Sequence, residues 1–184
     1  FGIECTVHDI AVLAQRVLED VSGYPCGLAT TAAPTIDRPG FVSPICCRPL
    51  ETGEAFVLPA GVTLLGIDSG VLHPKAAEKY RHARTTSLMG CTIIARLVNS
   101  ASNDGSEWHG HLARVTTTEY VDRFRDLLPT KLKGAMFLDR FGPLAHRSAR
   151  IDPTAIYKIR SRTEHHIYED ERVRQFVERL ARAS

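Results

Sequence analysis

Residues able to bind a small polar ligand follow a short apolar segment near the middle of the chain. Residues 62–67 are mostly apolar and β-rich, and the polar turn Asp68-Ser69-Gly70 comes directly after them. We therefore expect a buried strand that carries a carboxylate and a hydroxyl at its carboxyl end. The alternative is a plain connection, because Asp, Ser and Gly are common turn formers.

A predicted helix starts a few residues later, at Lys75. Its Tyr80 and Arg84 are four residues apart in the sequence, so their side chains share one helix face. A strand end and a helix that present a carboxylate, a hydroxyl, a phenol and a guanidinium would form one wall of a pocket for a small polar ligand.

Two further segments contain residues that could bind a ligand. The turn at residues 25–27 ends in Gly27 and leads into a short helical start that contains Thr30, which we expect Pro34 to stop. His109 and His111 could share a metal ion on an extended strand, but the sequence offers no obvious third ligand. We therefore interpret these histidines as surface residues and expect no metal site.

The overall composition is that of an ordinary soluble globular protein. Of the 184 residues, 43% are hydrophobic and 24% are charged, and this length suits one domain or parts of two. No apolar run approaches the roughly 18 residues of a membrane span, and no amino-terminal signal segment is visible. We therefore expect a cytoplasmic protein that has no contact with membranes.

The cysteines point to a reducing compartment. There are five of them, and Cys46 and Cys47 are adjacent in the sequence, so they cannot be joined to each other without strain. None has the CxxC or CxxH spacing of a zinc site. Free thiols in the cytoplasm are the expectation that follows.

The net charge of +2 is distributed unevenly along the chain. Residues 131–184 hold twelve Lys or Arg and seven Asp or Glu, a net charge of +5, which leaves −3 for residues 1–130. A basic carboxyl-terminal part can favour phosphate or nucleic acid. Its arginines alternate with acidic residues, however, so we interpret it as a solvated helix face and do not expect nucleic-acid binding.

The pattern of apolar residues predicts an α+β fold. Residues 40–67 contain three apolar runs separated by turn residues, which predicts a small antiparallel sheet packed with helices. The polar stretch 99–107 is the best candidate for a linker. Helices are predicted at residues 6–21, 75–98, 116–129, 130–141 and 160–182.

Most of these helices carry an apolar stripe that we expect to face the core. In the first helix the stripe consists of Val7, Ile10, Leu13 or Ala14, Val17 and Val21. In the later helices the expected core residues are Tyr120, Val121, Phe124, Leu127 and Leu128, then Leu132, Met136 and Phe137, and finally Val173, Phe176, Val177 and Leu180.

Four segments of the chain resemble one family of enzymes. Residues 66–73, followed by Tyr80 and Arg84, resemble a region of galactokinases and, more closely, of plant-type L-arabinokinases, both in the GHMP small-molecule kinase superfamily. Residues 23–27, 44–50 and 165–173 resemble further segments of the same kinases. Because the segments also occur in the order found in these kinases, the chain is identified as a member of this superfamily.

The resemblance implies a segment of an ATP-dependent sugar 1-kinase, which phosphorylates the anomeric hydroxyl of a monosaccharide. It implies a GHMP-kinase-like two-domain fold, with residues 1–61 ending the nucleotide-binding domain and residues 62–184 forming the start and middle of the carboxyl-terminal domain. ATP and Mg²⁺ would be the cofactors. We expect most residues that hold them to lie outside this chain, because the glycine-rich motifs of the family are not in it.

The resemblance also assigns roles to individual residues. It implies that the Gly27 amide, Asp68, Ser69 and the Tyr80 hydroxyl contact the sugar. Thr30 stands at the position of the family's catalytic aspartate, and a threonine does not accept a proton near neutral pH. Phosphoryl transfer can run largely on positioning and electrostatics, so the sequence leaves open whether this chain takes part in catalysis.

Two alternatives stay open at the level of sequence. In one, residues 27–33 correspond to the superfamily's phosphate loop, which holds nucleotide phosphates at a helix amino terminus, although Ala29 stands where that loop has a glycine. The other concerns function: a degenerate, non-catalytic module of the same fold would bind a sugar or another protein without turnover.

Overall fold

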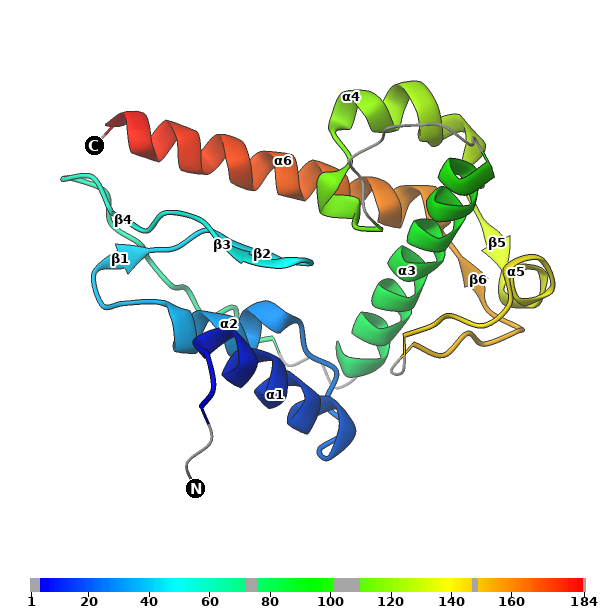
Figure 1. The fold of residues 1–184 in the computed structure, drawn as a ribbon, viewed down its shortest axis with the longest axis horizontal. Helices are drawn as coiled ribbons and strands as arrows, with labels where there is room; N and C mark the ends of the chain where they lie inside the picture. Colours follow the sequence, from blue (N-terminus) through cyan, green and yellow to red (C-terminus); the bar gives the residue numbers. More distant parts are fainter. Residues whose placement is uncertain (1–3, 72–75, 101–109, 147–148, 184) are drawn as a thin grey trace. The chain divides into compact units, whose positions relative to one another are not determined.

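The structure is a computed structural model that describes residues 4–71, 76–100, 110–146 and 149–183. The chain divides into two compact units (Figure 1), and the boundary between them falls once in the first turn of α3 and once within α6. Unit 1 consists of Phe1–Ala77 and Val173–Ser184, and unit 2 consists of Glu78–Arg172. Residues 99 and 100 of the predicted linker belong to the end of α3, whereas its residues 101–107, together with His73 and His109, lie outside the described residues.

Unit 1 begins with two helices that pack against each other. Helix α1 (Val7–Asp20) starts at a capping box, in which the Thr6 hydroxyl accepts a hydrogen bond from the Asp9 amide and the Asp9 carboxylate accepts one from the Thr6 amide. Helix α2 (Leu28–Ile36) contacts α1 through a small core of Ala11, Leu28 and Ala32. The predicted first helix is confirmed, whereas α2 continues for two residues beyond Pro34, which was expected to stop it.

The strands of unit 1 form two short antiparallel pairs. Strand β1 (Phe41–Val42) pairs with β4 (Phe56–Val57), and β2 (Ile45–Cys47) pairs with β3 (Leu50–Thr52) across a turn at residues 48–49. The inner pair is nested between the strands of the outer pair, so residues 41–57 form one interrupted hairpin. This confirms the predicted antiparallel arrangement for two of the three apolar runs.

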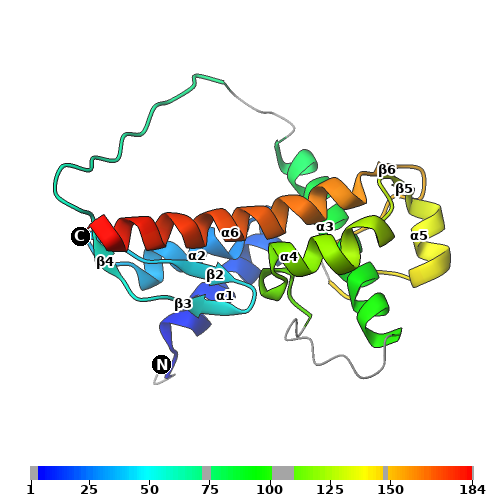
Figure 2. The ribbon, with the colours of Figure 1, turned by 90° about the horizontal axis from the view of Figure 1, so that it is seen from above.

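The third apolar run, residues 62–67, is not the buried strand that the sequence predicts. It has irregular backbone, and Figure 2 shows it in an extended trace without a neighbouring strand. Its side chains are exposed, with 82% of Leu65 and 89% of Ile67 accessible to solvent. A β-rich run needs a partner strand to pair its backbone groups, and the described residues of this chain supply none here.

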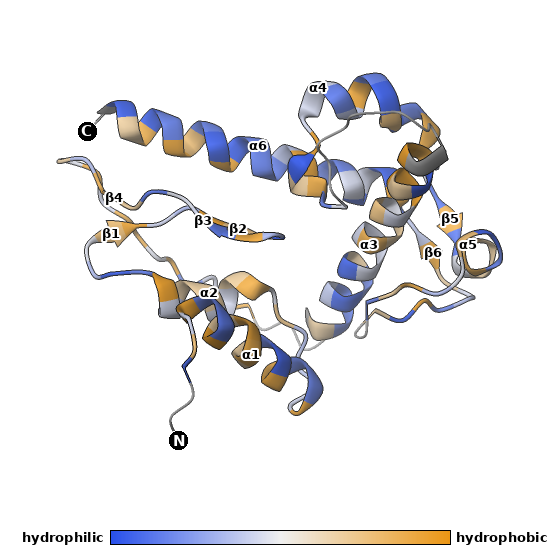
Figure 3. Ribbon diagram, in the orientation of Figure 1, coloured by the Kyte–Doolittle hydropathy of each residue, from blue (hydrophilic) through white to orange (hydrophobic). Residues whose placement is uncertain are grey.

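The apolar stripe of α1 is also exposed, contrary to expectation. Val7, Ile10, Leu13, Val17 and Val21 all have large accessible fractions, and Figure 3 shows orange apolar positions along this helix. The face that α1 turns toward α2 carries Ala11 and Val12. Small side chains let the two helices approach closely, which explains why Ala11 rather than the larger residues is fully buried.

Unit 2 contains most of the hydrophobic core. Its buried cluster includes Met89, Ile93 and Ile94 of α3, Tyr120, Phe124 and Leu128 of the middle segment, and Ile159 and Ile167 of α6. The elements that supply this core and its surroundings are α3 (Ala76–Ser100), η1 (Leu112–Arg114), α4 (Thr117–Glu119), the π-helical turn η2 (Tyr120–Phe124), η3 (Arg125–Leu127), β5 (Leu132–Lys133), α5 (Gly134–Phe141), β6 (Ile156–Tyr157) and α6 (Ile159–Ala183).

The helices predicted at residues 75–98 and 160–182 are confirmed as α3 and α6. In the region predicted as helix from residue 130, a short strand β5 comes before α5 and pairs with β6. The fold is therefore helix-rich α+β with small antiparallel sheets. No helix among the described residues has the length and apolarity needed to cross a membrane.

Part of each predicted apolar stripe is exposed. Val121, Leu127, Met136, Val173 and Phe176 have accessible fractions between 44% and 61%. In the middle segment, burial instead follows every fourth residue, at Tyr120, Phe124 and Leu128. The segment consists of the π-helical turn η2 followed by the 3₁₀ turn η3, so it is not the regular α-helix that the predicted stripe assumes.

Candidate functional site

Gly27 and Thr30 lie together at the start of α2. Gly27 is the cap residue, with φ −77° and ψ 153°, an extended conformation that any residue can adopt. Thr30 is exposed, and its amide donates a hydrogen bond to the Gly27 carbonyl at 3.1 Å. The Thr30 side chain is therefore accessible to a ligand, although it offers a hydroxyl where the resembling kinases have a carboxylate.

Some of the amides and hydroxyls with which a phosphate loop would bind phosphate at this helix start already form hydrogen bonds within the chain. Thr31 is buried, and its hydroxyl donates to the Leu28 carbonyl at 3.1 Å. The Ala29 amide is hydrogen-bonded to the side chain of Cys47. Of the two threonine hydroxyls only that of Thr30 is exposed, which weighs against the phosphate-loop alternative.

The environment of Cys47 does not favour a reactive thiolate. Burial raises its pKa, and this effect outweighs the hydrogen bond from the Ala29 amide, which acts in the opposite direction. A nucleophilic cysteine needs a lowered pKa. All five cysteines lie among the described residues, and none of them forms a disulfide.

Asp68 and Ser69 form a self-contained turn. One oxygen of the Asp68 carboxylate accepts a hydrogen bond from the Gly70 amide at 2.9 Å, and the Ser69 hydroxyl accepts one from the Val71 amide at 3.3 Å. Gly70 has a φ of 65°, which favours glycine. Both side chains are exposed, so the second carboxylate oxygen of Asp68 can bind a ligand.

Tyr80 and Arg84 lie one turn apart on α3, as predicted. Tyr80 is 39% exposed. Arg84 is half-buried, and its guanidinium donates a hydrogen bond to Nε2 of His146 at 3.2 Å. Sequence reasoning did not find His146, because it follows α5 and lies 62 residues away in the chain, a separation that leaves no local signal.

The predicted site residues therefore lie in three local groups. Gly27, Thr30, Asp68 and Ser69 belong to unit 1, and Tyr80 belongs to unit 2. Among the described residues, no hydrogen bond or ion pair joins the Asp68-Ser69 turn to Gly27 or Thr30. The described part of the chain also contains no group of three His, Cys, Asp or Glu side chains that could hold a metal ion.

A pocket of about 390 Å³ lies elsewhere, within unit 2. None of the ligand-binding residues predicted from the sequence lines it. Its walls carry three arginines, Arg96, Arg140 and Arg160, which come from α3, α5 and α6. Sequence analysis missed this feature because only the tertiary fold brings these arginines, which are far apart in the chain, to one cavity.

Comparison with known proteins gives one significant relative. The chain is 25% identical over 205 aligned positions to L-arabinokinase of Arabidopsis thaliana, and the alignment covers the whole chain and 20% of that enzyme. No protein-family model matches the chain. No solved structure matches it either. The similarity supports a distant relationship to a sugar kinase, of which this chain spans about a fifth of the length.

Proposed function

We propose that this chain is part of an ATP-dependent sugar kinase that transfers the γ-phosphoryl group to the anomeric hydroxyl of an arabinose- or galactose-like sugar. The observation that carries the proposal is the similarity to L-arabinokinase along the entire chain. The resemblance of residues 23–27, 44–50, 66–84 and 165–173 to segments of sugar kinases, in the same order, agrees with it. The cytoplasmic location and the kinase domain boundary at residues 61 and 62 belong to the same proposal.

In this proposal four residues recognise the sugar. The Gly27 amide, the free carboxylate oxygen of Asp68, the Ser69 hydroxyl and the Tyr80 hydroxyl each contact a sugar hydroxyl. All four are polar groups at least partly accessible to a ligand. Hydrogen-bond donors and acceptors of this kind are what a polyhydroxylated ligand requires, since each sugar hydroxyl both donates and accepts.

The chemistry of the proposed reaction places limits on Thr30. The attacking anomeric hydroxyl must lose its proton, and Thr30 does not accept it near neutral pH. Thr30 can only orient that hydroxyl by a hydrogen bond, so catalysis would depend on positioning and on electrostatic stabilisation of the phosphoryl group. In this proposal ATP would supply that group and Mg²⁺ would neutralise its charge, and most residues that hold them would lie outside this chain.

A calorimetric titration tests the proposal. The chain is titrated with L-arabinose and with D-galactose, each in the presence and absence of Mg-ATP. Saturable binding of either sugar is the expected result. Absence of binding to a chain that is folded by circular dichroism would overturn the assignment of the sugar-contacting residues.

The Tyr80→Phe variant tests one contact in the same assay. Loss of a neutral hydroxyl contact should weaken sugar binding by about 0.5–1.5 kcal/mol. Tyr168→Phe serves as the matched control, because Tyr168 is a half-buried tyrosine on α6 of the same unit and has no role in the proposal. An unchanged affinity in Tyr80→Phe would remove this residue from the site.

A non-catalytic relative is the second candidate function, and Thr30 favours it. A protein that has lost the catalytic carboxylate can keep sugar recognition without turnover. The two functions differ in the response to Thr30→Asp, which restores a carboxylate at an exposed position. The assay uses the full-length parent protein, in which release of ADP that depends on sugar with the native Thr30 supports the kinase. Its appearance only in Thr30→Asp supports the non-catalytic module.

A further inference from the structure

The pocket in unit 2 combines an apolar interior with a basic rim. Its apolar lining includes Ile93 and Leu132, which are largely buried, and Leu128, which is 1% exposed. Phe141 adds an aromatic ring to the same lining. A cavity of about 390 Å³ is at the small end of the range that holds small-molecule ligands.

The charged side chains that line the pocket are mostly basic. The lining residues include Arg96, Arg140 and Arg160 but only one acidic residue, Asp126, so their net formal charge is +2. The Asp126 carboxylate is 85% exposed and lies 3.8 Å from the Arg160 guanidinium. An exposed ion pair at this distance neutralises little of the positive charge.

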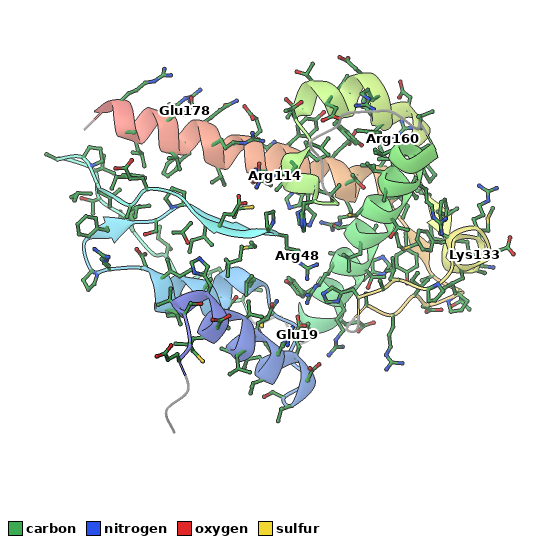
Figure 4. The ribbon with its side chains drawn as sticks, viewed as in Figure 1. Glu19, Arg48, Arg114, Lys133, Arg160 and Glu178 are labelled. Carbon is green, nitrogen blue, oxygen red and sulfur yellow. The ribbon has the colours of Figure 1, made fainter. Side chains whose placement is uncertain are left out.

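Arg160 is held in place by the fold. Its Nε and Nη2 atoms donate to the Leu128 carbonyl at 3.1 and 2.9 Å, and its side chain is 26% exposed at the start of α6 (Figure 4). These two bonds fix the plane of the guanidinium, and its Nη1 atom, which lies 3.8 Å from the exposed Asp126 carboxylate, can donate to a ligand. A positioned guanidinium loses little conformational entropy when it binds an oxyanion.

Arg140 supplies a second guanidinium that the described residues do not engage. It lies in the last turn of α5 and is exposed, and within the described parts of the chain no hydrogen bond or ion pair uses its side chain. Arginine prefers planar, multidentate contacts with phosphate or carboxylate oxygens. A ligand oxyanion would therefore find one fixed and one available guanidinium at the same cavity.

We propose that this pocket binds a small organic phosphate, with the dianionic phosphate among Arg96, Arg140 and Arg160 and an uncharged body against Ile93, Leu128, Leu132 and Phe141. The fixed guanidinium of Arg160 and the exposed guanidinium of Arg140 suit the dianionic group of a phosphate monoester better than a singly charged carboxylate. The apolar interior favours an organic ligand over the free ion. This site goes beyond the proposed sugar kinase function and uses none of its residues.

The test is a calorimetric titration of the chain with phenyl phosphate at constant ionic strength, compared with inorganic phosphate and benzoate. Phenyl phosphate should bind saturably and at least ten-fold more tightly than either comparison compound. Absence of saturable binding, or equal affinity for benzoate, would overturn the proposal. Tighter binding of inorganic phosphate would show that the apolar interior has no role, which also contradicts it.

Two variants locate the site. Arg140→Gln should weaken phenyl phosphate binding by about ten-fold or more, because a charge-assisted hydrogen bond is lost. Arg162→Gln removes the same charge from an exposed position on α6 that does not line the pocket, and it should change the affinity less than two-fold. Equal weakening by the two variants would show non-specific attraction to a basic surface and would overturn the assignment. Circular dichroism checks that both variants fold.

Discussion

Tyr120 places its hydroxyl in the core of unit 2 without a hydrogen bond. The residue is fully buried, and its hydroxyl oxygen finds no partner among the described residues. Its ring contacts the edge of Tyr168, with the ring centres 6.3 Å apart. A buried hydroxyl without a partner has lost its bonds to water and gained none in return.

The Tyr120→Phe variant should therefore be as stable as the unmodified chain, or more stable by up to about 1 kcal/mol. Tyr157→Phe is the matched control, because the Tyr157 hydroxyl accepts a hydrogen bond from the Asp152 amide at 2.9 Å, and it should lose about 1 kcal/mol. Urea denaturation measures both. Equal losses in the two variants would show that the Tyr120 hydroxyl has a partner after all.

The same tyrosine should affect stability at high pH. Burial, followed by the charges of Glu164 and Tyr168, raises the pKa of Tyr120 above its ordinary value of 10.0. The stabilisation that comes from keeping the phenol neutral is present below pH 10 and is lost as the pH rises toward the folded-state pKa. The stability difference between Tyr120→Phe and the unmodified chain should thus grow in favour of the variant above pH 10.

At the scale of residues, contacts between positions that are close in the sequence could be predicted, and contacts between distant positions could not. The Thr116 hydroxyl accepts a hydrogen bond from the Glu119 amide at 3.1 Å and caps the helix predicted from residue 116. This contact is local, since its partners are three residues apart. The contact between Arg84 and His146 spans 62 residues and was not predicted. The roles assigned to Gly27, Asp68, Ser69 and Tyr80 remain predictions.

The capping box of α1 gives a prediction at the scale of an element. Thr6→Ala removes the hydroxyl that accepts from the Asp9 amide at 3.1 Å, and it should cost about 1 kcal/mol of stability. Thr6→Ser keeps the hydroxyl and should retain most of the stability. Helix content by circular dichroism and urea denaturation check both variants. A loss in Thr6→Ser as large as that in Thr6→Ala would show that the hydroxyl does not cap the helix.

The capping box of α1 also predicts that the stability of the protein depends on pH in the acidic range. Hydrogen bonds from the Thr6 hydroxyl and then the Thr6 amide lower the pKa of Asp9 below its ordinary 3.8. A lowered folded-state pKa gives stability that is present above pH 3.8 and lost as the pH falls through the folded-state value. The advantage of the unmodified chain over Thr6→Ala should therefore shrink below pH 3.8.

The crossing of α3 and α6 depends on a glycine. A Cβ atom on Gly90 would lie 1.9 Å from the Thr163 hydroxyl oxygen and 3.2 Å from the Thr163 Cβ, and Thr163 is fully buried with its hydroxyl bonded to the Ile159 carbonyl at 3.0 Å. Gly90→Ala should destabilise the protein by about 1–3 kcal/mol, because the helices must move apart.

Two further variants show whether the contact with Thr163 causes the destabilisation expected for Gly90→Ala. Adding Thr163→Ala to Gly90→Ala removes the nearest atom and should restore part of the stability in thermal denaturation. Gly66→Ala is the control, because its Cβ would meet nothing within 4 Å, and it should change stability by less than about 0.5 kcal/mol. If the double variant is no more stable than Gly90→Ala alone, strain elsewhere in α3 is responsible.

At the scale of elements, the positions of the long helices were predictable and their buried faces were not. Periodicity and caps are local, so α1, α3 and α6 lie close to where the sequence predicts them. Which side of a helix is covered depends on the rest of the fold. The apolar stripe of α1 is exposed although its spacing is that of a core helix.

At the scale of the whole molecule, composition and pattern predicted the α+β class, because it follows from the elements that local sequence specifies. The pocket of unit 2 could not be predicted, since its arginines belong to three helices and meet only through the core that brings those helices together. Pairing over long distances also decides the state of residues 62–67, where pattern and structure disagree.

That disagreement can be tested on the intact chain by limited proteolysis. The described structure leaves Leu64 and Leu65 with accessible fractions of 69% and 82% in irregular backbone, so chymotrypsin should cut after one of them early in the digestion. Leu132, in strand β5 and 7% exposed, should remain uncut. Mass spectrometry of the first fragments identifies the cleaved bonds.

If the bonds after Leu64 and Leu65 survive as long as the bond after Leu132, residues 62–67 are protected, and the buried strand predicted from their sequence is the better description. Early cleavage there would mean that this segment has no partner strand within the chain, and that the Asp68-Ser69 turn following it is open to a ligand from solution.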